Sequence, residues 1–249
     1  MGTVTWGPEI AEHYDEGVAG RFAPEVLDPT VDLLAELAGG GVALELAVGT
    51  GRVALPLRAR GVEVAGIELS RHMVEQLRSK PGGDEIEVVV GDMASATVDR
   101  RCSLAFLVFN TIMNLTTQAE QVAVFRTAAA HLDPGGAFVV EVLVPGIDRL
   151  PRGEVARVFH HDERHVGVET FDDPVGQISW SHHWRDVGGR FTYDAAPYRY
   201  VWPSELDLMA ELAGLELEDR WADWDRSPFT ADSENQVVVY RRATGITPT

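Results

Sequence analysis

A glycine-rich segment, residues 45–52, holds the side chains of this chain that are best suited to bind a ligand. It joins a short apolar run to a helix-like stretch. Gly49 and Gly51 let the backbone turn sharply and approach a ligand without an intervening side chain. The helix that follows adds free backbone N–H groups and the positive end of its dipole. The segment therefore predicts a ligand-binding turn.

Two classes of ligand use such a turn. Gly49, Gly51 and Ala54 satisfy the G-x-G-x-x-G/A pattern of dinucleotide-binding folds. Glu45, an acid near the end of an otherwise apolar strand, favours the other class. Its charge would repel a pyrophosphate, whereas it would attract the α-amino group of a methionine moiety. The glycines alone fit either ligand, and Glu45 favours S-adenosylmethionine.

Polar groups also follow the next two predicted strands. Glu68 stands 17 positions after Gly51, and its carboxylate can accept hydrogen bonds from both hydroxyls of a ribose. Asp92 can accept from the exocyclic amine of an adenine, while the Met93 backbone N–H can donate to a ring nitrogen. Glu68 does not choose between NAD and S-adenosylmethionine, because both carry such a ribose. Three successive strand ends nevertheless predict one nucleoside site at the carboxyl edge of a sheet.

Alternating strand and helix patterns position these residues. We expect five strands, at 42–48, 62–67, 86–90, 104–109 and 137–144. Residues 1–24 show no helix cap, and Asp28 with Pro29 is interpreted as the start of the first helix. Ser70 is interpreted as the N-cap of a later helix, and Thr117 with Glu120 as the capping box of another. Strands that alternate with helices indicate βαβ units and a parallel sheet, so the fold class is α/β.

After Pro145 the pattern changes. Residues 154–202 contain no convincing helix but hold β-rich runs, and Gly188 with Gly189 predicts a hairpin. We expect an inserted antiparallel sheet of three or four strands. Ser204 is interpreted as the cap of a last helix, and the final strands are expected at 215–221 and 235–241.

The motifs ELAVGTGR, GIELS, GDM, FNTIMNL and LDPGGAFVVE resemble, in this order, the class I S-adenosylmethionine-dependent methyltransferases. The resemblance covers about 25–145, and YVWPSEL and AGLELEDRW in the tail are similar to the same family. It implies a Rossmann-like, seven-stranded, mostly parallel sheet with helices on both faces and an antiparallel last strand. The insert after strand five resembles that of amino-sugar N,N-dimethyltransferases and glycine/sarcosine-type N-methyltransferases, which are small-molecule enzymes.

The resemblance also implies roles for single residues. Glu45 and Ala47 would surround the methionine end of the cofactor, and Asn110 would lie near the transferred methyl group. Tyr14 looks like the N-terminal tyrosine that closes over cofactor and substrate in small-molecule members. The expected cofactor-binding set is Tyr14, Glu45, Ala47, Gly49, Gly51, Glu68, Leu69, Met73, Asp92, Met93 and Asn110.

Two positions depart from the family pattern. Ala47 stands where many members have a glycine, and Asn114 stands where the sugar enzymes have a histidine that has been considered a general base. An amide cannot take a proton at neutral pH, so the catalytic base is left unknown, with Tyr14 and Asn114 as candidates. Positioning alone can supply about 7–11 kcal/mol of the acceleration, so a missing base does not exclude methyl transfer.

The composition argues against several partners. The net charge is −18, from 21 Lys plus Arg against 39 Asp plus Glu, which disfavours nucleic acid and anionic membranes. Cys102 is the only cysteine, and neither a signal peptide nor a long apolar stretch is present, so we expect a cytoplasmic protein. The His160-His161 and His182-His183 pairs point to opposite faces of a strand, so no metal is expected.

Aromatic residues of the insert are candidates for contact with the acceptor, although they would equally fill a buried face. They are Trp180, His182, Tyr198 and Tyr200. We predict an S-adenosylmethionine-dependent methyltransferase, a monomer or homodimer acting at N or O of a small molecule. Residues 1–145 and 203–249 would bind the cofactor, and 146–202 would serve the substrate or oligomerisation. The alternatives are an NAD(P)-dependent oxidoreductase and a non-catalytic S-adenosylmethionine-binding protein.

Overall fold

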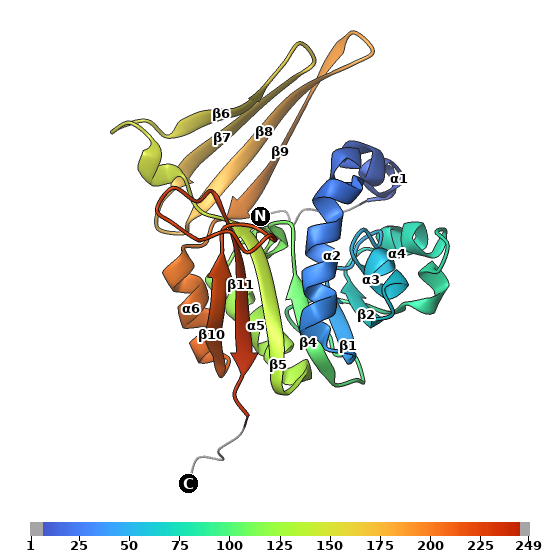
Figure 1. The fold of residues 1–249 in the computed structure, drawn as a ribbon. Helices are drawn as coiled ribbons and strands as arrows, with labels where there is room; N and C mark the ends of the chain where they lie inside the picture. The colour runs from blue at the N-terminus through green and yellow to red at the C-terminus, as the bar shows by residue number, and fades with distance from the viewer. Residues whose placement is uncertain (1–6, 245–249) are drawn as a thin grey trace.

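The computed structural model describes residues 7–244, apart from the side chains of Asp148 and Asp172. The ends of the predicted cofactor domain, 1–6 and 245–249, lie outside the described residues. A seven-stranded sheet with helices on both faces forms the body, and a four-stranded sheet extends from one end of it (Figure 1). The predicted α/β fold with an inserted antiparallel sheet is confirmed.

The main sheet has the strand order β10-β11-β5-β4-β1-β2-β3. The strands β1 to β5 run parallel, and β11 is antiparallel to both of its neighbours. The strand order reverses at β1, which lies between β4 and β2, and ligands of open α/β sheets bind at such a point. The strands are β1 (Val42–Leu46), β2 (Glu63–Glu68), β3 (Glu87–Val90), β4 (Cys102–Leu107), β5 (Leu132–Leu143), β10 (Leu215–Trp221) and β11 (Asn235–Arg242).

Helices cover both faces of this sheet. On one face lie α2 (Pro24–Ala38), α3 (Ala54–Ala59) and α4 (Arg71–Arg78), and on the other lie α5 (Gln118–His131) and α6 (Pro203–Leu212). In β4, Leu104 and Phe106 belong to one core and Ala105 and Leu107 to the other, all fully buried. Coverage on both faces explains why this strand is almost wholly apolar.

The insert is one antiparallel sheet of four strands in sequence order. They are β6 (Ala156–His161), β7 (His165–Asp173), β8 (Ile178–Val187) and β9 (Arg190–Arg199). Gly188 and Gly189 link β8 to β9 with φ of 64° and 84°, the backbone that a two-residue hairpin turn requires.

Three helix starts differ from the prediction. The segment without a predicted helix forms α1 (Pro8–Gly17) and the 3-10 turn η1 (Ala19–Phe22), and α2 begins at Pro24, with Pro29 inside the helix. Similarly, α6 begins at Pro203 after Trp202, so Ser204 is not its cap. All three helices start at a proline without a side-chain cap, because proline supplies the helical φ and lacks a donor that would go unpaired there.

The other caps are as predicted. The Ser70 hydroxyl accepts from the Met73 N–H, and Thr117 with Glu120 forms a complete capping box at the start of α5. Cys102 is buried. Within residues 7–244, no helix is long and apolar enough to span a bilayer.

Candidate cofactor and acceptor site

The loop after β1 has the backbone that its glycines predict. Ala47, Gly49 and Gly51 have φ of 60°, 55° and 81°, the left-handed region that favours glycine. A Cβ on Gly51 would lie 2.3 Å from the Leu77 Cδ1 atom, whereas a Cβ on Gly49 would have no neighbour closer than 4.0 Å. Gly51 is therefore required by packing. Gly49 leaves its side of the loop open to a ligand.

Glu45 is a buried acid that lacks a full set of partners. Its side chain is 4% exposed, and its Oε2 atom has no hydrogen-bond partner among residues 7–244. Burial raises the pKa of Glu45 to about 8, against the opposing effects of Arg52 and the Ala54 backbone N–H. A buried polar atom without a partner is costly, so this oxygen fits a cationic ligand group such as an α-ammonium.

Glu68 ties the glycine loop to the end of β2. Its carboxylate accepts from the Gly49 N–H at 2.9 Å and from the Ser70 N–H at 2.8 Å. Burial raises the pKa of Glu68, and these backbone donors oppose the rise. Each carboxylate oxygen can accept a further hydrogen bond, so both hydroxyls of a ribose could still be held.

The end of β3 completes the row of strand ends. The Gly91 N–H donates to the Glu68 carbonyl at 2.9 Å, and Asp92 is exposed, with Oδ1 accepting from the Ala94 N–H at 2.8 Å. Leu69 is 54% exposed, and Met93 is 9% exposed. Met73, another member of the predicted cofactor-binding set, is only 3% exposed, so it presents less surface to a ligand than Leu69 or Met93.

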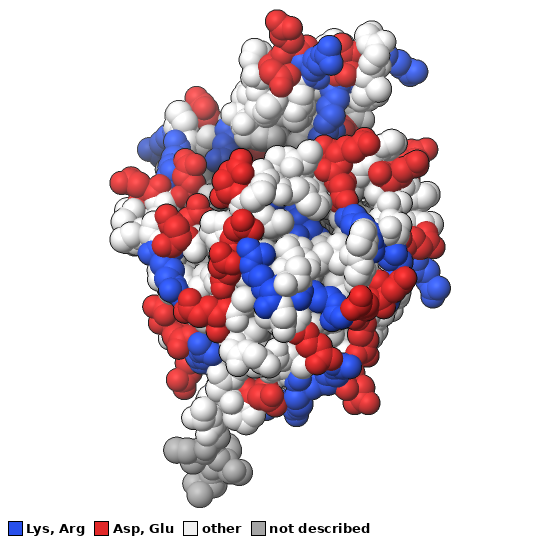
Figure 2. Space-filling view, turned by 45° about the vertical axis from the view of Figure 1, so that its right-hand side comes forward, with Lys and Arg blue, Asp and Glu red and all other residues white. Residues whose placement is uncertain are grey.

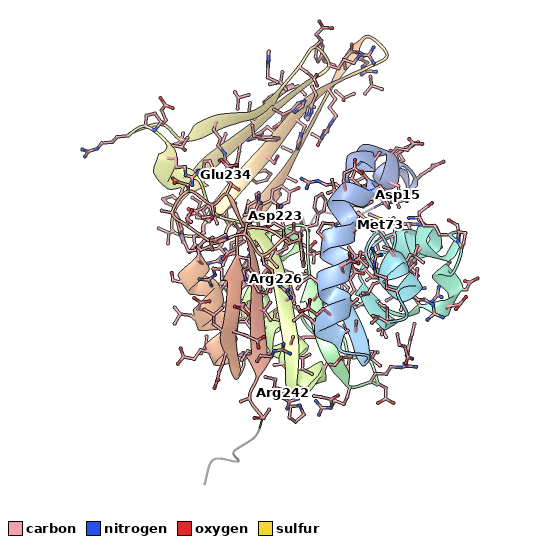
Figure 3. The ribbon with its side chains drawn as sticks, in the orientation of Figure 1. Asp15, Met73, Asp223, Arg226, Glu234 and Arg242 are labelled. Atoms are coloured by element: carbon pink, nitrogen blue, oxygen red, sulfur yellow. The ribbon has the colours of Figure 1, made fainter. Side chains whose placement is uncertain are left out.

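Helix α1 is fastened to the glycine loop. The Thr50 hydroxyl donates to Asp15 Oδ1 at 2.6 Å, and Lys80 pairs with Asp15 and donates to the Thr50 carbonyl at 2.7 Å. Asp15 and Met73 are close in Figure 3, where α1 meets α4. The tie holds Tyr14, which precedes Asp15 on α1, beside the loop.

Tyr14 is half-buried beside the loop acids. Burial raises the pKa of its hydroxyl; Arg52 lowers it, and Asp15, Glu68 and Glu45 raise it further. These couplings place the hydroxyl within electrostatic reach of both strand-end acids. The structure therefore brings Tyr14, predicted from resemblance alone, to the same site as Glu45 and Glu68.

The segment after β4 holds two consecutive residues in the left-handed region. Phe109 and Asn110 both have φ of 59°. The Phe109 N–H donates to the Glu141 carboxylate at 2.8 Å, and Asn110 Oδ1 accepts from the Leu143 N–H at 2.7 Å. The end of β4 is thus tied to the end of β5, and Asn110 is fixed beside both strand ends.

Two arginines contact the Phe109 ring. The guanidinium carbons of Arg21 and Arg52 lie 5.2 and 5.0 Å from its centroid. Sequence reasoning missed these three residues, together with Asp15 and Lys80. Arg52 could have been found, because it closes the glycine motif; the others gain their place only from tertiary contacts.

The base of the insert packs beside Asn114. Asn114 is half-buried at the end of η3 (Thr111–Asn114), which lies against β9. Gln121 Nε2 donates to the carbonyls of Ile112 and Arg199, each at 3.1 Å, and the buried Arg199 pairs with Glu205 at 2.6 Å. The polar network fixes how the insert meets the segment that follows β4.

The four acceptor candidates of the insert do not share one face. Trp180 and His182 alternate on one face of β8, and Tyr198 pairs with Ser179, which places it on the other face. Tyr200 is 5% exposed and packs edge-on against Phe171, with centroids 6.0 Å apart, so it fills the core. His182 Nδ1 lies 2.9 Å from the Tyr193 hydroxyl.

Comparisons with known proteins agree with this geometry. Residues 43–136 match the family described as a methyltransferase domain. The structure of the CcbJ methyltransferase from Streptomyces caelestis is 39% identical with a TM-score of 0.85, covering 98% of this chain and 100% of that one. The cypemycin N-terminal methyltransferase of a Streptomyces species is 29% identical over 240 residues, which are 92% of this chain and 97% of that protein.

A further structure shares the fold. The S-adenosylmethionine-bound CalS10, an amino pentose methyltransferase from Micromonospora echinaspora, has a TM-score of 0.70 at 22% identity and covers 92% of this chain and 96% of that one. The chain belongs to the class I S-adenosylmethionine-dependent methyltransferases, and S-adenosylmethionine is its cofactor. The open side of Gly49 and the unpartnered oxygen of Glu45 fit that cofactor. The comparisons support neither the oxidoreductase nor the non-catalytic alternative.

Proposed function

We propose that the cofactor lies along the carboxyl ends of β1, β2 and β3. Glu45 Oε2 would accept from the α-ammonium of the methionine moiety, and Arg52 would pair with its carboxylate. Glu68 would hold the ribose. Asp92 and Met93 would bind the adenine, with Leu69 against the ring. The observation that carries this placement is the buried, unpartnered oxygen of Glu45, which a cation would satisfy.

Bound there, the cofactor supplies a methyl group activated by a sulfonium. The chain's own contribution is placement: Ala47 and Gly49 allow close backbone approach, and Asn110 stands at the neighbouring strand end. The hydrogen bond between Thr50 and Asp15 holds α1 beside the loop, where it would cover part of the bound cofactor. Holding a nucleophile on the methyl axis can replace about 7–11 kcal/mol of the barrier.

We propose that the acceptor atom is the nitrogen of a small amine. Asn110 and Asn114 cannot accept a proton, and the raised pKa of Tyr14 keeps its hydroxyl protonated at neutral pH. A free amine needs no base to present its lone pair, whereas an alcohol does. The relatives include a dTDP-3-amino-3,6-dideoxyglucose N,N-dimethyltransferase from Streptomyces fradiae, 32% identical over 53% of this chain and 52% of that protein.

We propose that the insert, residues 146–202, contributes to acceptor binding and to any pairing of two chains as a homodimer. Its support is the set of aromatic side chains that the sheet leaves exposed, among them Trp180 and Tyr193.

Nucleic acid is not a proposed partner. Figure 2 shows acidic and basic side chains interspersed on one face without a broad basic field, and the net charge is −18.

Calorimetric titration tests the proposed placement. S-Adenosylmethionine, S-adenosylhomocysteine and NADH are titrated into the wild type, Glu68→Ala and the control Glu63→Ala, an exposed acid at the other end of β2. We expect both sulfur ligands, but not NADH, to bind the wild type. Glu68→Ala should weaken binding about a hundredfold or more, because two hydrogen bonds to a charged group are lost. Failure of both sulfur ligands to bind the wild type contradicts the proposal.

The choice of nitrogen is tested by the pH dependence of the rate. With a series of amine acceptors, kcat/KM should rise with pH up to the pKa of each amine, because only the free base reacts. A rise at one fixed pH for all acceptors would instead reveal a base on the protein. Methylation of the matching alcohols at a similar rate would also contradict the choice.

A further inference from the structure

Two cations converge on one aromatic ring beside the proposed site. Arg21 is exposed on η1, and Arg52 is half-buried after the glycine loop. Their guanidinium carbons lie 5.2 and 5.0 Å from the centroid of the Phe109 ring, within the usual range of a cation–π contact. Within the described part of the chain, neither has a carboxylate oxygen within 4.0 Å. Arg58 and Arg60, by contrast, are paired with acids. The charges of Arg21 and Arg52 are therefore not neutralised by a contacting carboxylate of residues 7–244.

The ring is held there against a backbone preference. Phe109 has a φ of 59°, in the left-handed region that a residue with a Cβ adopts only at an energetic cost. The Phe109 N–H donates to Glu141, and the next residue is fixed through Asn110 Oδ1 and the Leu143 N–H. Strain that neighbouring contacts enforce is concentrated at functional sites. The strained backbone of Phe109 holds the ring in the position where it contacts both guanidinium groups.

The two arginines differ in their surroundings. Arg52 is electrostatically coupled to Glu45 and Tyr14, so it belongs to the inner part of the site, where the proposed function pairs it with the methionine carboxylate. Arg21 is exposed and follows α1, the helix that carries Tyr14 over the loop. It lies against the same ring as Arg52 but, unlike Arg52, is exposed to solvent.

We propose that Arg21 binds an anionic group of the acceptor, a carboxylate or a phosphate, and thereby selects amines that carry such a group. The proposal rests on the proposed function, because it assumes that Arg52 serves the cofactor. A guanidinium donates through a planar pair of N–H groups that match either oxyanion. Phe109 limits the directions in which Arg21 can point, so less freedom is lost on binding.

Matched probes test the proposal by calorimetry on protein saturated with S-adenosylhomocysteine. Glucosamine 1-phosphate is compared with glucosamine, and alanine with alaninamide, so that phosphate and carboxylate are tested separately. The variants are Arg21→Ala, Arg21→Lys and the control Arg190→Ala, an exposed arginine beside the β8–β9 hairpin turn (Figure 1). Thermal unfolding of each variant checks that it is folded.

We expect at least one anionic probe to bind the wild type and Arg190→Ala ten- to a hundredfold more tightly than its neutral partner. Arg21→Ala should abolish this preference, Arg21→Lys should keep part of it, and S-adenosylhomocysteine affinity should change less than threefold. The proposal is overturned if neither anionic probe is preferred, or if Arg21→Ala keeps the preference. A tenfold loss of S-adenosylhomocysteine affinity in Arg21→Ala would also overturn it, by assigning Arg21 to the cofactor. If S-adenosylhomocysteine does not bind the wild type, the proposed function itself fails.

Discussion

The main sheet and the inserted sheet are built on opposite principles. Strand β4 is covered by helices on both faces, and its Phe106 is fully buried. The insert is a single layer, and Phe191 and Tyr193 on β9 remain 66% and 57% exposed. Because sheets normally bury at least one face against another layer, the difference indicates that the first sheet provides stability and the second provides surface.

The two faces of the insert also differ from each other. One carries Trp180, Trp184 and Tyr193, which lie together in the register of β8 and β9. The other carries the ion pair of Arg185 with Asp194 and a row of histidines. The first face also carries His182 and the second Tyr198, so the two faces differ in the balance of aromatic and charged side chains rather than by strict segregation. The proposed role of the insert in acceptor binding rests on this exposed surface, and the proposed selection by Arg21 would act beside it from η1.

Truncation of a phenylalanine in each sheet should give the largest difference. Phe106→Ala removes a fully buried ring from the core and should lower the free energy of unfolding by about 3–5 kcal/mol. Phe191→Ala removes a ring that is mostly in water and should cost less than about 1 kcal/mol. Urea unfolding of both variants measures the two values. Equal losses would show that the insert is covered in solution.

Substitution of one glycine in each region compares how strongly the two backbones depend on glycine. Gly51→Ala combines a φ of 81° with a Cβ placed 2.3 Å from Leu77 Cδ1, so we expect a loss of about 2–4 kcal/mol. Gly189→Ala, at φ 84° in open space, should cost about 1 kcal/mol from backbone strain alone. Thermal unfolding ranks the pair, and the reverse order would contradict the packing role of Gly51.

Cofactor affinity at the edge of the main sheet should depend on pH through Glu45. Because the pKa of Glu45 is raised to about 8, its carboxyl group is mostly protonated at pH 7 in the free protein. The carboxyl group must therefore release a proton before it can pair with an α-ammonium. S-Adenosylhomocysteine affinity should therefore rise roughly tenfold or more from pH 6 to pH 8, and should fall only at higher pH, where the ammonium of the ligand loses its own proton.

Titrations in buffers of different ionisation enthalpy count the released proton. At pH 7 we expect the wild type to release nearly one proton for each ligand that binds. The Glu45→Gln variant should release none from residue 45. A wild-type affinity that stays flat from pH 6 to pH 8 would show that Glu45 is already ionised in the free protein.

The smallest effect is expected from the histidines of the insert. Burial, followed by the charge of Arg185, lowers the pKa of His183 to about 4, so the unfolded chain binds its proton more readily. The stability that depends on neutral His183 is complete above pH 6.5 and is lost as the pH falls toward 4. Because the ring is partly exposed, the loss should stay below about 1 kcal/mol. The difference between wild type and His183→Ala, measured by urea unfolding from pH 7 to pH 4, isolates it.

Much of the fold followed from local patterns. The alternating apolar runs predicted the strands, and Gly188 with Gly189 predicted the hairpin, because these features depend on neighbouring residues only. The starts of α1, α2 and α6 were missed, since a proline at the first helical position leaves no cap for the sequence to reveal. Pro29 shows the converse: burial of Leu27, Val31 and other residues of α2 outweighs an interior proline.

The site divides in the same way. Glu45, Glu68 and Asp92 could be predicted to lie close together, because each stands at or near the end of a strand and parallel strands bring their carboxyl ends to one edge. The approach of Arg21 to Phe109 and the tie between Asp15 and Thr50 were not found, because they join segments far apart in the sequence. The split of Trp180 and Tyr198 between two faces required the register of β8 and β9.

The most direct test of the cofactor placement is a crystal structure of the protein with S-adenosylhomocysteine. We predict the α-amino nitrogen within hydrogen-bond distance of Glu45 Oε2, both ribose hydroxyls on Glu68, and the adenine amine at Asp92. A ligand bound with its ribose away from Glu68, or with Glu45 Oε2 still unpartnered, would contradict the account.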